Sequence, residues 1–542
     1  MRRSWWFLGA LAVAAVLFTC YLLQSRTVTD GSDGASQALQ AWDMLHGNPL
    51  LRGWWLTDVS FYTTELPQYV LVERLFGLSA DVMHIAGAMT YTLLVLLAAF
   101  LARGRARGRA GLVRAAVAGG VMLAPQLSGS GTLLLSPDHV GTGVPVLAVL
   151  LFIDLAGERW YVPAVTGVAL AWIAVADAMA VFAAVIPLAL VYALRAIQGL
   201  RGATGLPGSR GSQVFQRLRT RWFAASMAVA SLLSIPLEVV ATRLIQAFGG
   251  WQVHGLHTAL AGTALLAGNL RLTGRGLLEL FGADVFDAGS GIGVAFAVVH
   301  LAGVVAVIYG FCRALRLFFR GDAVIEPVLV TGIVIDVAAY AAGVQAVNLL
   351  STREIAPVLP FGAVLAGRLL GPRLAGARES GPRPDGPRPS GGGRAPRLVP
   401  VLGVVLACYA GMLGYSAAQP AAQPQYADLA AWLTSHGFTS GLSGYSQANI
   451  VTAQTGGRVS LRPVVDSGRF VAGRLWNASS AWFDPSRQSA DFLVLSSAGD
   501  YEVNEPNALA TFGPPARTYR YREYTIMVWP GNLLQKLHGD IG

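Results

Sequence analysis

The segment TVTDGSDGASQALQAWDMLHGN, residues 27–48, follows closely on an apolar run from Trp5 to Leu23. The run is long enough to cross a bilayer, which takes about 20 apolar residues. Two carboxylates, Asp30 and Asp33, stand where the chain leaves the membrane, and apolar residues at helical spacing begin immediately afterwards at Ala35. The segment therefore predicts a membrane anchor, an acidic turn and then an amphipathic helix.

Composition places the whole chain in a membrane. Of its 542 residues 54% are hydrophobic and 13% are charged, whereas soluble domains carry about 25% charged residues. The net charge of +10 comes from arginines in short segments between apolar runs, such as Ala102–Arg114 and Cys312–Arg320. That distribution is typical of cytoplasmic loops, so the positive charge does not indicate nucleic-acid binding.

Apolar runs of spanning length recur along the chain. We predict eleven membrane spans, near residues 5–23, 83–102, 112–128, 143–157, 161–176, 178–197, 223–246, 291–311, 323–343, 354–371 and 399–417. The predicted fold class is mainly α: a polytopic membrane helical bundle with a small C-terminal α/β domain. Spans 161–176 and 178–197 form a closely spaced, short pair.

Charge orients these spans. The basic segments fall on one side of the membrane if the N-terminus is cytoplasmic: they are Arg2–Arg3, Arg103–Arg114, Arg195–Arg221, Arg313–Arg320 and Arg373–Arg397. The opposite, extracytoplasmic side then receives residues 24–82, 129–142, 247–290, 344–353 and the tail 418–542. Residues 372–398, rich in Pro and Gly, form a predicted disordered cytoplasmic linker within the 1–417 transmembrane domain.

The first outer loop opens with the amphipathic helix. Asp33 stands where an N-cap belongs, and Gly47 closes the helix as a C′ glycine. Gln37 and Gln40 lie opposite the apolar face, so we expect the helix to lie along the membrane surface with those glutamines in water. A second amphipathic helix is expected to start at Pro67.

An aspartate just before an interfacial A-x-x-x-W-x-x-L-x-G-N helix, after the first span, resembles the GT-C superfamily. These are multi-span glycosyltransferases that use polyprenyl-phosphate-linked sugars. The resemblance implies that Asp33, or failing that Asp30, is the catalytic base; without it, Asp33 is a helix cap and Asp30 a loop residue. Here the acids stand in DGSDG, where members of the superfamily commonly have adjacent acids.

The same resemblance implies a donor-phosphate site. Arg353, at the outward mouth of a late span in NLLSTREIAPVLP, matches the donor-phosphate arginine of several GT-C families, and guanidinium binds phosphate oxygens bidentately. Asp138 and His139, in LLLSPDHVGTGVP, match the second acidic loop. That loop sometimes holds a divalent cation, Mg or Mn, but no DxD or ExD pair occurs here, so a metal stays open. The alternatives are a turn residue for Asp138 and an interfacial arginine for Arg353.

Three further acids, Asp58, Glu65 and Asp177, are candidate substrate-binding residues on the outer side; Asp177 equally fits a turn between two spans. Asp336, in GIVIDVAAY, falls inside a span, where an unpaired carboxylate is costly. We expect a hydrogen bond in the bundle interior to hold it.

After the last span, residues Tyr426–Val464 read as helix, strand, helix, strand, and Asp491–Ser497 and Thr518–Pro530 supply further strands. About 120 residues suffice for a core, so 418–542 is a predicted extracytoplasmic α/β domain. It lacks a nucleophile elbow, P-loop or zinc motif, which favours acceptor binding or a lid over independent catalysis.

The resemblance, together with the topology, implies a plasma-membrane glycosyltransferase that moves a sugar from a lipid-linked donor to an envelope glycan, lipid or protein, with inversion and an Asp base. Two alternatives remain open. One is a transporter or flippase of a lipid-linked saccharide, for which only Asp336 lies at a suitable depth and no internal repeat is visible. The other is a catalytically inert envelope scaffold.

Overall fold

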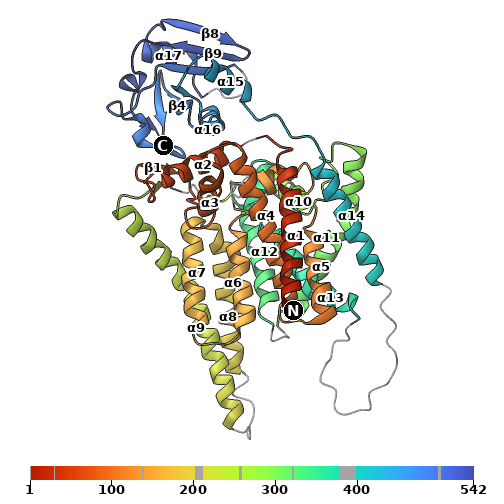
Figure 1. Cartoon of the computed structure of the whole chain (residues 1–542). Helices are drawn as coiled ribbons and strands as arrows, with labels where there is room; N and C mark the ends of the chain where they lie inside the picture. The colour runs from red at the N-terminus through yellow and green to blue at the C-terminus, as the bar shows by residue number, and fades with distance from the viewer. Residues whose placement is uncertain are drawn as a thin grey trace.

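The computed structural model describes residues 2–29, 31–135, 139–201, 211–255, 259–319, 323–376, 398–497 and 502–541. Its helices form an elongated bundle, and the C-terminal domain sits on one end of it (Figure 1). We call this the domain end and the opposite one the far end. Asp30, Asp138 and linker residues 377–397 lie outside the described residues.

Seven helical segments of the described chain are long and apolar enough to cross a membrane. This confirms a multi-pass membrane protein. The seven match predicted spans and lie in α1 (Arg2–Ser25), α4 (Asp81–Arg103), η2 with α8 (Val181–Val185 and Ile186–Arg201), α9 (Gly211–Ala247), α11 (Gly291–Leu317), α12 (Ile325–Ala342) and α14 (Leu398–Ala417).

The other four predicted spans are shorter or bent. They correspond to α5 (Gly108–Val121), α6 (Gly143–Ala156), α7 (Val162–Ala176) and the pair η3 (Leu349–Ile355) and α13 (Val358–Leu374), which bend by 56° at their junction. At about 1.5 Å per residue, a helix of this length falls short of a bilayer core of about 30 Å. The predicted span 112–128 extends past the end of its helix, because the chain turns after Val121, ahead of Pro125.

Helix α13 is buried along most of its length. It packs against α4, α5, α11 and α12. Gly367 makes this possible, because a Cβ there would lie 2.5 Å from the main-chain oxygen of Arg114 on α5 and 2.8 Å from the Cβ of Ala102. The close packing fixes α13, and with it the preceding turn η3, within the bundle.

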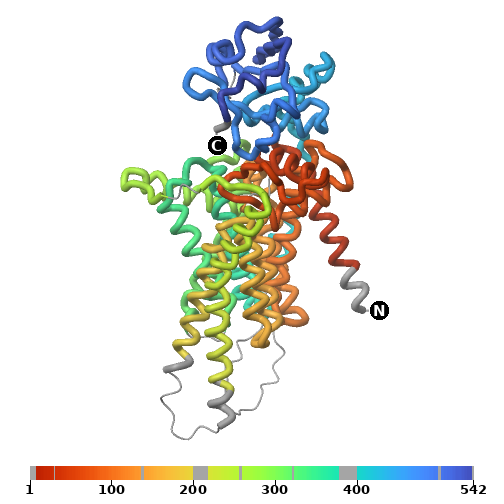
Figure 2. Tube along the Cα trace, turned by 90° about the vertical axis from the view of Figure 1, so that its left-hand side faces the viewer, coloured from red at the N-terminus to blue at the C-terminus, as the bar shows by residue number. Residues whose placement is uncertain are grey.

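At the domain end, α2 (Ser32–Leu45) begins at its N-cap Gly31, so Asp33 lies in the first turn and is not the predicted cap. The predicted C-terminal end of the helix is confirmed, since Gly47 follows the helix with φ +101°. Gln37 and Gln40 are 3% and 2% exposed, which corrects the expectation of a polar face in water. The C-terminal domain packs against α2, and Figure 2 shows the domain lying directly over this part of the bundle.

The remaining bundle elements are α3, η1 and α10. Helix α3 (Leu66–Phe76) starts beside Pro67 as predicted and leaves Leu75 and Phe76 exposed. The π-helical turn η1 (Gly131–Leu135) and the amphipathic helix α10 (Thr263–Leu280) lie against η3.

A three-stranded sheet joins three distant segments at the domain end. Its order is β2-β1-β6, from β1 (Trp54–Leu56), β2 (Gln252–Val253) and β6 (Ala478–Ser479). Strand β1 is parallel to β2 and antiparallel to β6. The sheet therefore ties the first outer loop to the C-terminal domain through main-chain hydrogen bonds.

The C-terminal region contains a seven-stranded mixed sheet of order β10-β5-β4-β3-β7-β9-β8. Its first elements follow the predicted order: α15 (Ala427–Ser435), β3 (Ser440–Ser443), α16 (Tyr445–Gln454) and β4 (Ser460–Ser467). The others are β5 (Phe470–Arg474), η4 (Ser480–Phe483), β7 (Phe492–Ser496), α17 (Glu505–Phe512), β8 (Arg517–Tyr521), β9 (Tyr524–Val528), η5 (Leu533–Lys536) and β10 (Asp540–Ile541). Strands β3, β4 and β7 pair in parallel, as an α/β arrangement requires.

Candidate active site

A cavity of about 150 Å³ lies between the bundle and the C-terminal domain. Helix α2, the loop after β1, the loop before α6, η3 and the segment before β6 each contribute to its wall. The residues with polar or aromatic side chains that line it are Asp33, Gln37, Gln40, Thr57, Asp58, Ser60, Phe61, His139, Arg353, Trp476 and Asn477. Four predicted site residues, Asp33, Asp58, His139 and Arg353, are thus brought together.

Asp33 and Arg353 form an ion pair across this cavity. Nη2 of Arg353 lies 3.4 Å from Oδ2 of Asp33, and the two side chains are 29% and 38% exposed. A pair this exposed contributes at most about 1 kcal/mol to stability. The pair therefore adds little to stability, and both groups are accessible from the cavity. These two facts favour a functional role for the pair over a structural one.

The position of Arg353 is set by its own turn and by α10. The side chain of Asn348 accepts a hydrogen bond from the amide of Ser351, and the Ser351 side chain bonds back, so η3 begins with a capping box. The hydroxyls of Tyr340 and Ser351 lie 2.7 Å apart. The neighbouring Thr352 packs directly on Gly276 of α10, where a Cβ would come within 2.9 Å of the Thr352 Cβ.

The C-terminal domain reaches Asp33 through Tyr445, the first residue of α16. The Tyr445 hydroxyl donates to Oδ1 of Asp33 at 3.2 Å and lies 3.0 Å from the hydroxyl of Ser36. Tyr445 is 6% exposed. Burial and the charge of Asp33 raise the pKa of Tyr445 well above its usual range, so the phenol stays protonated and acts as a donor.

Asn477 holds this tyrosine from the other side. Its Nδ2 donates to the Tyr445 hydroxyl at 3.1 Å, and its Oδ1 accepts from the Thr57 amide at 3.3 Å and from Gln40 at 3.4 Å. The network therefore links α2, the β1 segment and the C-terminal domain around the Asp33 carboxylate.

His139 adds a second cation to the cavity. It has a left-handed backbone with φ +54°, and its Nδ1 lies 3.0 Å from Oδ2 of the buried Asp177. Burial acts to lower the pKa of His139, but the charge and hydrogen bond of Asp177 outweigh it and raise the pKa to about 9. His139 is therefore an imidazolium at neutral pH.

Asp177 accepts from Thr142 at 2.6 Å and from the Met179 amide at 2.8 Å as well as contacting His139. It ends α7 at a turn, one of the two predicted possibilities, and reaches the cavity only through His139. Burial acts to raise the pKa of Asp177, but His139 and these hydrogen bonds lower it below its ordinary value.

The remaining predicted acids differ in their placement. Asp58 is exposed and lines the cavity. Glu65 is buried, accepts a hydrogen bond from Thr64 and packs against Gly141, away from the cavity lining.

Asp336 is 1% exposed. Neither of its carboxylate oxygens has a hydrogen-bond partner among the described residues, so the interior hydrogen bond predicted for it is wrong.

For a divalent cation, the described residues contain no group of three or more His, Cys, Asp or Glu side chains arranged to hold one. Asp138, the acid of the predicted metal loop, lies outside the described residues. A bound Mg or Mn therefore stays a prediction, and no step below depends on it.

Tyr445 and Asn477 were not identified as site residues from the sequence. Tyr445 is one of several aromatic residues in the tail, and Asn477 carries no local signal. Both acquire their place from the docking of the C-terminal domain onto α2, which no short-range pattern encodes.

No protein-family model and no curated protein matches the sequence. Among solved structures, the chain is similar to ArnT from Cupriavidus metallidurans in the apo state, with a TM-score of 0.51, 16% identity and coverage of 97% of this chain and 98% of that chain. The same protein bound to undecaprenyl phosphate gives a TM-score of 0.50 at 13% identity, with coverage of 96% and 97%. The apo oligosaccharyltransferase of Archaeoglobus fulgidus gives 0.46 at 11% identity, with coverage of 91% and 70%. The likeness to ArnT is one of fold and extends over nearly the whole of both chains.

Proposed function

We propose that this chain, which has the GT-C fold, is a membrane glycosyltransferase that takes its sugar from a polyprenyl-phosphate donor. Transfer takes place in the cavity beneath the C-terminal domain, on the face that the arginine distribution predicts to be extracytoplasmic. Asp33 is the general base, and Arg353 with His139 binds the donor phosphate. The observation that carries the proposal is the meeting of Asp33 and Arg353 across one accessible cavity.

The charges of the cavity support a phosphate ligand. Arg353 and the imidazolium of His139 are two cations within one small space, and charge-assisted hydrogen bonds to phosphate are among the strong ones in proteins. ArnT, whose fold this chain shares, has been solved with undecaprenyl phosphate bound. A lipid phosphate is therefore the ligand that fits both the local charge and the fold.

The reaction follows from the two oxygens of Asp33. Oδ1 is held by Tyr445, and Oδ2 faces Arg353. A donor phosphate competes for the guanidinium and leaves Oδ2 to accept the proton of the acceptor hydroxyl. The acceptor oxygen bonds to the anomeric carbon as the carbon–phosphate oxygen bond breaks, and the electron pair leaves with the polyprenyl phosphate. Attack opposite the leaving group inverts the anomeric centre.

An acceptor enters most simply from the side of the C-terminal domain. Trp476 and Asn477 form that wall of the cavity, and an indole ring offers a flat apolar surface for a sugar face. This arrangement fits a saccharide-bearing acceptor such as an envelope glycan or glycolipid; a protein acceptor is the alternative within the same mechanism.

The test is transfer of radiolabelled sugar from undecaprenyl-phosphate pentose and hexose donors, each supplied in turn to membranes containing the full-length chain. We expect the Asp33→Asn and Arg353→Ala variants to lose at least roughly 100-fold in rate, the scale for a positioned base. The matched controls are Asp81→Asn and Arg26→Ala, which break an ion pair of 3.1 Å at the same end of the bundle, away from the cavity.

Unchanged transfer in Asp33→Asn would refute the proposed base. Movement of the labelled saccharide across vesicles without formation of a new glycosidic bond would support the flippase. Absence of both transfer and movement in the wild-type chain, with every donor and with correct folding, would support the inert scaffold.

A further inference from the structure

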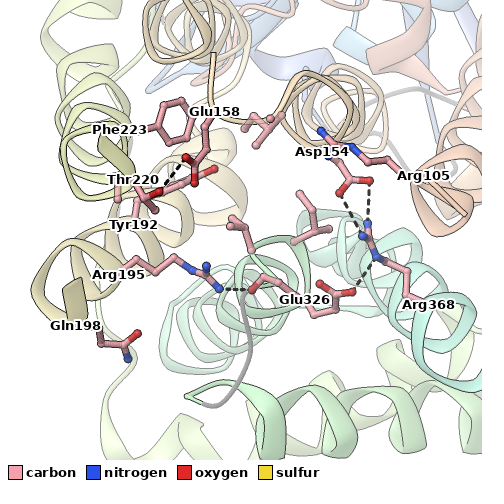
Figure 3. A pocket seen from close by; sticks show the side chains of 16 residues that line it. Arg105, Asp154, Glu158, Tyr192, Arg195, Gln198, Thr220, Phe223, Glu326 and Arg368 are labelled. Carbon is pink, nitrogen blue, oxygen red and sulfur yellow. Dashed lines mark hydrogen bonds and ion pairs between the residues drawn. The ribbon is translucent and has the colours of Figure 1, made fainter. Parts of the chain in front are cut away.

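A network of charged side chains borders a cavity of about 440 Å³ at the far end of the bundle. Figure 3 shows Arg368 between two carboxylates there, and this residue pairs with Asp154 at 3.2 Å and with Glu326 at 2.9 Å. The three residues belong to α13, α6 and α12. The network therefore ties three helices of the bundle together.

A second pair of charged side chains lies in the C-terminal domain, against Tyr445. It consists of Arg474, the last residue of β5, and Glu502, ahead of α17. Nη1 of Arg474 donates to Oε1 of Glu502, and the two side chains are 28% and 22% exposed. The pair is thus partly shielded from water, which strengthens it relative to an ion pair on an open surface.

Glu502 holds the main chain of Tyr445. Tyr445 begins α16, whose N-cap Gly444 has no side chain that could accept a hydrogen bond from the first turn. Oε2 of Glu502 accepts from the Tyr445 amide instead. A carboxylate is favoured at this end of a helix, because the first amides lack partners within the helix and the helix dipole is positive there. Gly444 leaves room for the carboxylate, since a Cβ at this position would lie 3.2 Å from Oε2.

Arg474 holds the ring of the same tyrosine. Its Cζ lies 5.1 Å from the centroid of the Tyr445 ring, which is within the range of a cation–π interaction. A positive charge beside a phenol also makes its O–H group a stronger hydrogen-bond donor. Tyr445 is therefore held at its amide and at its ring by two residues that also bind each other.

The hydroxyl of this ring is the group that reaches the candidate active site. It donates to Oδ1 of Asp33 at 3.2 Å, and Asn477 donates to it at 3.1 Å. Arg474 and Glu502 are not among the residues that line the cavity. Their contacts therefore reach Asp33 by way of Tyr445.

We propose that Arg474 and Glu502 are positioning residues for sugar transfer, which together hold Tyr445 so that its hydroxyl donates to Asp33. This inference rests on the function proposed above. The pair acts on the step in which Asp33 accepts a proton and leaves donor binding unchanged, because the proposed phosphate ligands, Arg353 and His139, belong to the bundle.

The first experiment measures transfer kinetics of the full-length chain in membranes. Arg474→Met keeps a long side chain but removes its charge, and we expect kcat to fall by roughly 3- to 30-fold, the range of one cation–π contact, with the donor KM nearly unchanged. Arg474→Lys keeps the charge without the planar guanidinium and should lie between Arg474→Met and the wild type. Glu502→Gln should also lower kcat, because the amide oxygen still accepts from Tyr445 but no longer attracts Arg474 by charge.

Arg522→Met is the matched control. Arg522 makes the same two kinds of contact in the same domain, an ion pair with Asp428 and a cation–π contact of 5.6 Å with Tyr521. Neither partner lines the cavity, so kcat should equal that of the wild type. Equal losses in Arg522→Met and Arg474→Met would show a general effect on the domain and would overturn the proposal.

A double-mutant cycle separates positioning from stability. In Tyr445→Phe the hydroxyl is absent, so adding Arg474→Met should change kcat by less than about 2-fold, the limit within which independent effects add. If Arg474→Met lowers kcat by the same factor with and without the hydroxyl, the arginine does not act through Tyr445.

A second measurement does not depend on transfer. Fluorotyrosine is incorporated at position 445 of the full-length chain, and its fluorine NMR signal is recorded in detergent. The signal should move in Arg474→Met and in Asp33→Asn but not in Arg522→Met. A signal that is unchanged in Arg474→Met would overturn the proposed contact.

The two experiments distinguish failure of this inference from failure of the proposed function. If Asp33→Asn and Arg353→Ala abolish transfer while the Arg474 and Glu502 variants keep full kcat, the positioning role is wrong and the function stands. If the wild type transfers no sugar but the fluorine signal responds as expected, the function is wrong and the contact between the pair and Tyr445 stands.

Discussion

The phenolic oxygen of Tyr445 lies 3.2 Å from Oδ1 of Asp33, although the two residues are 412 positions apart. The carboxylate belongs to the membrane bundle and the phenol to the C-terminal domain. The domain therefore completes the wall of the candidate active site, and its docking surface on α2 is part of the geometry on which the proposed reaction depends.

Loss of this contact should slow transfer without abolishing it. In Tyr445→Phe the Asp33 carboxylate loses a hydrogen-bond donor, and such bonds to charged groups contribute about 1.5–3 kcal/mol. We expect kcat to fall by roughly 10- to 100-fold, with the donor KM nearly unchanged because the phosphate contacts remain. Tyr521→Phe, in the aromatic cluster of the same domain around Trp432, should keep full activity. Equal losses in both variants would show a general effect on the domain.

Asp33→Asn should separate activity from stability. The Asp33–Arg353 pair is more than one-third exposed on the carboxylate side, so its removal should change the free energy of unfolding by less than about 1 kcal/mol. Thermal unfolding of the purified variant should therefore match the wild type while transfer is lost. A fall in the unfolding midpoint as large as that of a core variant would contradict a catalytic interpretation of this pair.

The elements that the sequence predicted well are those with long, local patterns. The seven full-length spans rest on runs of about 20 apolar residues, and the stop of α2 rests on one glycine with φ +101°. The predicted outward position of Arg353, at the mouth of a span, places it in the wall of the cavity, while its role in binding phosphate stays a prediction. In each case the physical cause lies within a few turns of the residue itself.

The parts that were missed depend on contacts between distant segments. Gln37 and Gln40 have the periodicity of a water-facing surface, yet the docked domain buries them. Strands β2 and β6 have two residues each, too few for an alternating pattern. Tyr445 and Asn477 likewise owe their roles to this interface, so no window of the sequence could indicate them.

The His139–Asp177 pair predicts a specific pH dependence. The pKa of His139 is raised from about 6.5 to about 9, so the folded state binds the proton more tightly than the unfolded state does. The stabilisation is complete below about pH 6.5 and is lost as the pH rises through 9. The unfolding midpoint of the wild type should therefore fall more steeply between pH 7 and 9.5 than that of His139→Gln. The donor KM should rise over the same range, because the imidazolium is lost.

His436→Gln provides the control for this titration, since His436 is exposed on the C-terminal domain. Its pH profile should follow the wild type. If His139→Gln also follows the wild type, the pair does not contribute to stability in this range. On the acid side the pKa of Asp177 is lowered, so its contribution should persist until the pH falls through that lowered value.

The last prediction concerns two glycines on one helix. Gly276 and Gly274 both lie on α10, but a Cβ at Gly276 would collide with Thr352, within 2.9 Å of its Cβ and closer still to its Cγ2, whereas Gly274 has nothing within 4 Å. Thr352 cannot easily turn away, because it is fully buried, β-branched and donates to the Leu349 carbonyl at 2.6 Å.

Gly276→Ala should therefore displace η3 and with it Arg353, at a cost of about 1–3 kcal/mol in stability and a rise in the donor KM. Gly274→Ala should be neutral or stabilise the helix by up to about 1 kcal/mol. Adding Thr352→Ser to Gly276→Ala removes the methyl group nearest the new Cβ, leaves only the 2.9 Å approach between the two Cβ atoms, and should restore most of the donor affinity. Because a merely destabilised chain would not regain donor affinity through a smaller side chain, failure of this rescue would mean that the contact between α10 and η3 does not position Arg353.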